Sequence, residues 1–564
     1  MLPDPGIQPL LPRARVAPLP LRHCRRGPRS GRAWLDAVPA PRSPRYGPVM
    51  PRAFNTAGPC KPDIHYMLRP DRRLPGLRAL IDGQSYFVIH APRQSGKTTA
   101  LMALARELTA SGKYTSVVLT METGEPFRED LEGLEPAILG RWQKTCRAHL
   151  PPELQPPAWP EAPRGDRIGS ALTVWALASA RPLVLFLDEI DALQDEALLT
   201  VLRQIRGGYA DRPQAFPAAL GLVGLRDVRD YKVASGGSAR LGTASPFNIK
   251  VGSFTLANFT TDDVAELYAQ HTAETGQAFD SPALTAAWAL TQGQPWLVNA
   301  IARECVLVVR ADGATVTVGD VEQAAENLMR RMDTHLDSLA EKLHEPRVRA
   351  LIEPILSGGA AENVPMDDIQ YVLDLGLVRR APDGGLVIAN PIYAAVIPRM
   401  LAFVPRHGLP QIPATWLRPD GSLDEALLLD AFLSFWRQYG EAMQRTASYA
   451  EVAAQLIVLA YLDRVANGGG WVTPEYSLGR DRLDLCLRWR QQRVALELKA
   501  WRDGRPDPER AGLGQLDGYL GKLGLDHGWL MIFDQRAGLP PIEERTTTSP
   551  ALTPAGRRVT VIRG

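Results

Sequence analysis

The sequence has few cysteines and no long apolar run. Its 564 residues include five cysteines, and this odd, scattered set disfavours a disulfide framework or a zinc site and suits a reducing cytoplasm. No apolar run approaches the roughly 18 residues that span a bilayer, so no membrane partner is expected. The first residues lack the basic and apolar segments of a secretory signal. We therefore expect a cytoplasmic protein, with two or three domains given its length.

Charge is unevenly distributed along the chain. The formal net charge is +2, but residues 1–50 contain nine arginines and two aspartates, which leaves the remainder at about −5. A mildly acidic body disfavours bulk coating of nucleic acid, although it permits a local basic groove. Residues 1–50 are also proline-rich without an apolar period, which predicts a disordered basic extension. It is either a basic arm that contacts nucleic acid or a dispensable, mis-assigned extension with Met50 as the true start.

Strand-like and helical patterns alternate after residue 54, which predicts an α/β fold with a mainly parallel sheet and helices on both faces. The strand-like runs are residues 86–90, 116–119, 183–187 and 219–225. A mostly helical region follows, and then a helix and two short apolar strands joined by a Pro-Asp-Gly-Gly turn, which is typical of a winged helix.

The segment APRQSGKT, residues 91–98, fits the phosphate-binding loop pattern except that alanine replaces the first glycine. A strand precedes it and a helix follows, so backbone amides and the positive helix end can cradle phosphates. Lys97 is expected to neutralise phosphate oxygens and Thr98 to ligate Mg²⁺. The alternative is a solvated strand-to-helix turn. The predicted nucleotide-binding residues are Ala91, Arg93, Gln94, Ser95, Gly96, Lys97, Thr98 and Thr99.

The run LVLFL, residues 183–187, is followed by Asp188 and Glu189. A strand that is apolar at every position is buried on both faces, and its carboxyl end is where acidic side chains meet a ligand. We expect Asp188 to hold Mg²⁺ with Thr98, and Glu189 to polarise the attacking water as a catalytic residue. The alternative is a buried strand ending in a solvated acidic turn. Together the two motifs predict ATP and Mg²⁺ as cofactors.

With HYMLRP, GLVGLRD and GQPWLVNA, these motifs resemble the bacterial AAA-like ATPases over roughly residues 54–400. The resemblance implies a helical lid, in which Gly293 and Pro295 help close over the nucleotide, followed by a winged helix. The strand before Arg226 should supply a polar sensor, and Arg226 and Asp227 are unusual candidates. No arginine finger can be named, and a homo-oligomer is compatible with the resemblance.

Residues 479–499, GRDRLDLCLRWRQQRVALELK, predict a hairpin of two alternating strands. A turn at 490–491 pairs Asp484 with Glu497, whereas a turn one residue later pairs it with Lys499. Either register brings the three polar groups within roughly 5–8 Å. Two carboxylates that hold a divalent cation and a lysine beside the attacking water are suited to phosphodiester hydrolysis. The alternative is an exposed hairpin with one solvated, mixed-charge face.

Gln515 and Tyr519 share a face of the next helical stretch, and Glu451 in the preceding one could reach the same cation. Helix, strand, strand and helix with these residues resemble the PD-(D/E)XK nuclease superfamily over about residues 430–535. The resemblance implies DNA as substrate, with Glu475 and Arg480 as further candidates. Its implied catalytic residues are Asp484, Glu497, Lys499 and Gln515. Its implied metal ligands are Asp484, Glu497 and Glu451.

The leading hypothesis is an AAA-like ATPase that controls a metal-dependent nuclease acting on DNA. The alternative is a regulatory NTP-binding switch whose C-terminal domain binds nucleic acid or protein without cleavage. The expected divisions are a disordered basic extension at 1–50, an ATPase core at 54–258, a helical lid at 259–335, a winged helix at 340–404, a linker at 405–422 and an α/β nuclease-like domain at 423–564.

Overall fold

The structure is a computed structural model, and it describes most of the chain after residue 51. The described residues are 52–69, 72–127, 130–225, 249–331, 339, 341–356, 364–382, 384–402, 409, 414–446, 452–466, 469–475 and 483–564. The predicted extension at 1–50, part of the predicted linker, Arg226, Asp227, Glu451 and Arg480 lie outside these residues.

A five-stranded sheet organises the first part of the chain, in the order β2-β3-β4-β1-β5. Its strands are β1 (Tyr86–His90), β2 (Thr115–Thr120), β3 (Leu183–Asp188), β4 (Ala219–Gly224) and β5 (Lys250–Thr255). Every neighbouring pair is parallel, which confirms the predicted parallel α/β sheet. The patterns did not predict β5, because an edge strand that contains lysine, glycine and serine has little apolar signal.

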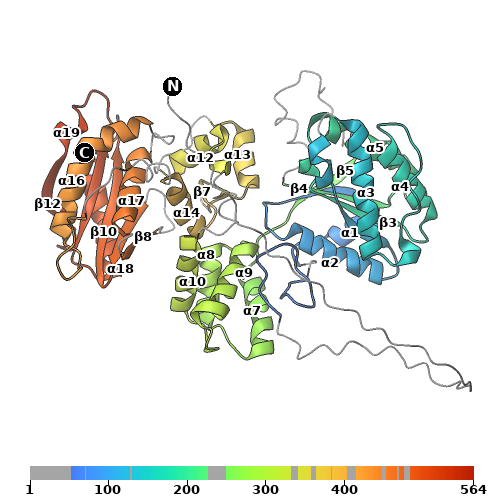
Figure 1. The fold of residues 1–564 in the computed structure, drawn as a ribbon, viewed down its shortest axis with the longest axis horizontal. Coiled ribbons are helices and arrows are strands. Elements are labelled where there is room, and N and C mark those ends of the chain that lie inside the picture. The colour runs from blue at the N-terminus through green and yellow to red at the C-terminus, as the bar shows by residue number, and fades with distance from the viewer. Residues whose placement is uncertain are drawn as a thin grey trace, which may run out of the picture. The chain divides into compact units, whose positions relative to one another are not determined.

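Helices cover both faces of this sheet (Figure 1). One core joins strand residues to α1 and α2, and a second joins them to α3, α4 and α5. The central strands β3 and β4 are buried at every position, as expected where both faces are covered. The helices are α1 (Leu77–Asp82), α2 (Lys97–Ala110), α3 (Leu131–His149), α4 (Arg167–Ala178) and α5 (Asp195–Gly207).

A mostly helical region follows the sheet. It comprises α7 (Thr261–Thr275), α8 (Ser281–Thr291), α9 (Pro295–Glu304) and α10 (Val318–Arg331). After it come α12 (Pro346–Leu356), α13 (Met366–Asp374), β6 (Val378–Arg380), β7 (Leu386–Ile388) and α14 (Pro391–Leu401). Strands β6 and β7 are antiparallel, so two helices precede a short hairpin and a third follows it.

A six-stranded mixed sheet organises the C-terminal part, in the order β12-β13-β11-β10-β9-β8. Its strands are β8 (Gly470–Glu475), β9 (Leu483–Trp489), β10 (Gln492–Trp501), β11 (His527–Asp534), β12 (Thr547–Leu552) and β13 (Arg558–Arg563). Helices α16 (Glu425–Thr446) and α17 (Ala453–Ala466) pack on one face, and α18 (Glu509–Leu523) packs on the other. A four-residue helix, α19 (Ile542–Arg545), precedes β12. Figure 1 shows this sheet in orange and red.

The helical region that precedes β8 consists of two helices, α16 and α17. Phe432 and Phe435 of α16 contact Tyr461 of α17, with ring centroids 5.3 and 4.9 Å apart. A continuous helix rises about 1.5 Å per residue and would hold these rings tens of ångströms apart. The chain must therefore reverse direction between the two helices.

Gly293 lies before α9 in a conformation that a side chain would not fit. Its φ is +71°, and a Cβ there would lie 1.9 Å from the Phe259 carbonyl oxygen. The Phe259 amide donates to the Gly293 carbonyl at 2.8 Å, so the two segments cannot easily separate. Gly276, by contrast, has φ +80° with nothing within 4 Å of a Cβ.

We expect Gly293→Ala to lower the free energy of unfolding by about 3 kcal/mol, because backbone strain and a backbone clash act together. Gly276→Ala should cost about 1 kcal/mol, from strain alone. Chemical denaturation of the two variants beside the wild type measures both values. Equal losses would contradict the close approach of Phe259.

Candidate functional site

The first candidate site lies where strands β1 and β3 end. Strand β4 lies between them and pairs with both in parallel, so their carboxyl ends meet at the same edge of the sheet. The Ala91 amide donates to the Gly224 carbonyl at 3.3 Å, which ties the loop after β1 to the end of β4. Ala91 is buried and has no positive φ. An alanine therefore fits where the loop pattern has glycine.

The loop after β1 wraps around the Lys97 side chain. Its ammonium group donates to the carbonyl oxygens of Ala91 at 2.6 Å and Pro92 at 2.9 Å. Gly96, at φ +81°, is the N-cap of α2 and turns the chain into the helix. Burial lowers the pKa of Lys97 to about 8, against the opposing charge of Asp188. A half-buried lysine that donates to two neutral carbonyl oxygens favours an anion beside it.

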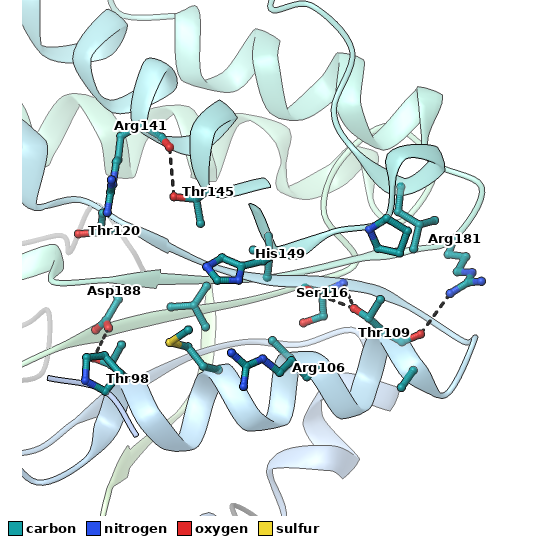
Figure 2. Close-up of a pocket in the computed structure, with 18 of the residues that line it drawn as sticks. Thr98, Arg106, Thr109, Ser116, Thr120, Arg141, Thr145, His149, Arg181 and Asp188 are labelled. Atoms are coloured by element: carbon teal, nitrogen blue, oxygen red, sulfur yellow. Dashed lines mark hydrogen bonds between the residues drawn. The ribbon is translucent and has the colours of Figure 1, made fainter. Parts of the chain in front are cut away.

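Thr98 and Asp188 come together across the edge of the sheet. The Thr98 hydroxyl donates to the Asp188 carboxylate at 2.6 Å, although 90 residues separate them in the sequence. Asp188 is 3% exposed, and burial raises the pKa of its carboxyl group. A hydroxyl and a carboxylate at the start of this helix are the oxygen ligands that Mg²⁺ prefers. Figure 2 shows the pair at one end of a cavity.

Glu189 follows Asp188 in the left-handed region, at φ 60° and ψ 39°. This conformation is costly for a residue with a side chain and is concentrated at functional sites. The Thr120 hydroxyl, at the end of β2, donates to the Glu189 carboxylate at 2.6 Å. Thr120 was not predicted from the sequence. Thr120 reaches Glu189 because β2 lies beside β3 in the sheet, and the order of strands cannot be predicted from local sequence.

The loop at residues 91–96 has hydrogen-bond donors that are available to a nucleotide phosphate. The Ser95 hydroxyl is buried without a hydrogen-bond partner. Within the described part of the chain, the amides of residues 93–96 donate to no protein group. Unpaired donors at a helix start are the arrangement that binds phosphate. Arg93 and Gln94 are exposed beside it, whereas the Thr99 hydroxyl instead accepts from the Cys60 amide at 3.0 Å.

Arg73 is a second residue that the sequence patterns did not reveal. It is 7% exposed and donates through Nε and Nη2 to the Ala257 carbonyl, at 3.0 and 2.6 Å. Its guanidinium lies 4.8 Å from the centroid of the Phe259 ring. A Cβ on Gly96 would lie 3.2 Å from its Nη1. A buried cation therefore borders the loop from outside the motif.

The second candidate site lies on the β9–β10 hairpin. The register pairs Asp484 with Glu497, the first of the two expected alternatives, and the turn lies at 490–491. On the next strand, Glu475 of β8 pairs with Asp484. The backbone positions of three acidic residues are thus in line across β8, β9 and β10. The structure describes only the backbone at positions 475 and 484.

Glu497 is wholly buried, on the face of β10 that α18 covers. Its Oε1 lies 2.7 Å from the Lys499 ammonium, and the Lys499 side chain is 11% exposed. The other carboxylate oxygen of Glu497, Oε2, has no hydrogen-bond partner, and the Gln515 amide oxygen also lacks one. The alternative of a solvated hairpin face does not describe this carboxylate.

A carboxylate oxygen without a donor suits a divalent cation, so Glu497 fits an expected metal ligand in kind. Tyr519 is buried on the same helix, one turn after Gln515. Among the described residues no group of three or more His, Cys, Asp or Glu side chains is placed to hold a metal ion. The side chains of Asp484 and Glu451, the other two expected metal ligands, lie outside that description.

No model of a known protein family matches the chain, and no curated protein matches it. Solved structures share low similarity. The Walker-type ATPase of Pyrococcus abyssi is 13% identical, with a TM-score of 0.42 over 60% of this chain and 98% of that chain. Cdc6p from Pyrobaculum aerophilum is 15% identical, with a TM-score of 0.34 over 62% and 96%.

RuvB of Thermotoga maritima, a Holliday junction branch migration motor, is 15% identical, with a TM-score of 0.32 over 56% of this chain and 90% of that chain. At this level of similarity the geometry of the two sites must support any function. In the described part of the chain, no helix combines the length and apolar character needed to cross a bilayer.

We expect Lys499→Met to lower the free energy of unfolding by about 3 kcal/mol, because it leaves the buried Glu497 carboxylate without its ion pair. Glu497→Gln should cost less, because the Lys499 ammonium that it leaves unpaired is partly exposed to solvent. Lys522→Met removes an exposed lysine of α18 and serves as the control. Chemical denaturation measures all three, and equal effects at 499 and 522 would contradict a buried pair.

Proposed function

We propose that the protein binds and hydrolyses ATP in its first domain and that this activity controls a Mg²⁺-dependent nuclease in its C-terminal domain. The residues proposed for nucleotide binding are Ala91, Arg93, Gln94, Ser95, Gly96, Lys97, Thr98 and Thr99. The residues proposed for the nuclease are Asp484, Glu497, Lys499, Gln515 and Glu451, and its proposed substrate is DNA.

The hydrogen bond between Thr98 and Asp188 is the observation on which the ATPase proposal rests. It places a hydroxyl and a carboxylate beside a helix start whose loop amides are unpaired. Mg²⁺, when bound, neutralises charge on phosphate oxygens. Thr98 and Asp188 would hold it, Lys97 would turn from the loop carbonyls to the phosphates, and Glu189 would orient a water molecule.

Burial of Glu497 beside Lys499 supports the nuclease proposal. An exposed pair would be an ordinary surface feature, whereas an ion pair whose carboxylate is wholly buried inside a covered sheet face is costly to desolvate. Such a cost is commonly retained at functional sites. Lys499 would orient the attacking water, and the carboxylates would hold the cation that stabilises the developing phosphate charge.

Two substitutions separate nucleotide binding from turnover. Lys97→Ala should abolish ATP binding, because it removes the cation of the loop. Glu189→Gln should keep ATP binding and lower turnover by about 100-fold or more, the usual contribution of a positioned base. Equilibrium binding of a fluorescent ATP analogue and a phosphate-release assay measure the two steps.

Glu196→Gln, which changes an exposed carboxylate at the start of α5, should leave both steps unchanged. Loss of ATP binding in Glu189→Gln, or normal turnover in Lys97→Ala, would contradict the proposed roles.

The nuclease is tested with supercoiled plasmid and Mg²⁺, with and without ATP. Wild type should nick or linearise the plasmid, and Lys499→Ala should lower the rate by about 100-fold or more while still binding DNA. Lys522→Ala, on the exposed side of α18, should cut normally. Lys97→Ala should remove the dependence of cleavage on ATP.

A wild-type protein that binds DNA and cuts none under any nucleotide condition would refute the nuclease. It would instead favour the alternative of a regulatory NTP-binding switch whose C-terminal domain binds without cleavage. The ATPase proposal would stand or fall separately, on the binding and turnover assays.

A further inference from the structure

A cavity of about 730 Å³ lies beside the proposed nucleotide site, along the outer strand β2. Thr98, Asp188 and Glu189 line one end of it, and Arg181 lines it near Thr109 and Ser116. Binding sites for small organic ligands commonly have volumes of roughly 300–1,000 Å³. The cavity is therefore large enough for a ligand of its own.

The cavity exists because β2 is an edge strand. Val117 and Leu119 belong to the core under α3, while Ser116 and Val118 face the side of α2. Helix α2 covers part of that side and forms one wall. The end of α3 and the following Pro151–Leu154 segment form the other wall.

Three cationic or titratable side chains, each exposed to solvent, line this cavity. Arg106 comes from α2, whereas Arg141 and His149 come from α3. Figure 2 shows Arg141 and His149 on one side of the cavity and Arg106 on the other. Burial lowers the pKa of His149, and the charges of Arg106 and Arg141 lower it further. Two guanidinium groups thus lie close enough to the imidazole to repel its proton.

The Glu122 carboxylate is close enough for the charge of Arg141 to act on it, but it does not line the cavity. Within the described part of the chain, neither Arg106 nor Arg141 takes part in an ion pair. The acidic side chains that line the cavity are Asp188 and Glu189 at the nucleotide end and Glu153 on the opposite wall. Like charges brought together without a counter-charge are unfavourable, and an anion between them relieves the repulsion.

Apolar groups lie beside the charges. Met102 and Ala105 of α2, Val118 of β2 and Leu154 line the same cavity. Met102 is only partly buried. A ligand with both an anionic group and a flat apolar part would satisfy the guanidinium groups and cover this surface. A nucleotide monophosphate has this chemistry.

We infer that this cavity is a second ligand site, for an organic phosphate of nucleotide size, with its phosphate between Arg106, Arg141 and His149. Arginine is suited to this role because its planar donors match phosphate oxygens in pairs. The site is distinct from the phosphate-binding loop, since the loop residues 91–96 do not line it. It shares Thr98, Asp188 and Glu189 with the proposed ATPase site.

Because the two sites share these residues, a ligand in the cavity would regulate ATP turnover. This part of the inference rests on the proposed function. A ligand in the cavity would lie next to Glu189, the residue proposed to orient the attacking water, and next to Thr120, which donates to the Glu189 carboxylate. Its occupancy would therefore change ATP turnover. Binding of the ligand itself requires no ATPase activity.

The test is calorimetric titration of guanosine 5′-monophosphate into the full chain after saturation with ADP and Mg²⁺. Wild type should bind one equivalent, and Arg106→Gln/Arg141→Gln should bind about tenfold or more weakly, because two charge-assisted contacts are lost. The control is Lys144→Gln/Arg147→Gln, which removes the same charge from exposed positions of α3 that do not line the cavity. It should bind as wild type does.

Absence of binding to wild type, or equal weakening in the two double variants, would overturn the inference. Tighter binding of a single-stranded oligothymidylate at the same arginines would also overturn it, in favour of a nucleic-acid strand. Failure of ADP to bind in the first step would refute only the proposed nucleotide site. The guanosine 5′-monophosphate titration is therefore repeated on Lys97→Ala, where retained binding supports the cavity alone.

Discussion

The first part of the chain depends on the contact between Thr98 and Asp188 at the edge of its five-stranded sheet. The hydroxyl belongs to the helix after β1 and the carboxylate ends β3, and β4 must lie between these strands for the two to touch. The unpaired loop amides, the folded-back Lys97 and the left-handed Glu189 all surround this contact. Without it, the phosphate-binding motif would be a turn beside an unrelated acidic residue.

Much of this arrangement could be predicted from local sequence. The phosphate-binding loop is recognisable from its residue pattern. The apolar run before Asp188 and Glu189 is recognisable because a strand covered on both faces needs apolar residues throughout. Thr120 and Arg73 carried no such signal. Thr120 and Arg73 lie at the site because of which strands and segments are neighbours in the fold. The periodicity of the sequence does not predict this order.

In the C-terminal part of the chain, too, some features could be predicted from local sequence and others depend on tertiary contacts. Alternation predicted the hairpin, but two registers were open. Arg490, in the left-handed region at φ 51°, marks the turn that selects one of them. Strands β8, β11, β12 and β13 were not predicted, since short or continuously apolar runs give ambiguous periods. The burial of Glu497 depends on α18 covering this face, which is a tertiary property.

The position of strand β4 in the sheet affects when the nucleotide site can form during synthesis of the chain. It is contributed late, by residues 219–224, yet it lies between strands formed by residues 86–90 and 183–188. Contacts of such long sequence separation form slowly during folding. A nascent chain that stops before β4 would contain all residues of both nucleotide motifs. It would lack the strand that holds β1 and β3 together, and therefore the pocket between their ends. Acquisition of nucleotide affinity would therefore report completion of the core during synthesis.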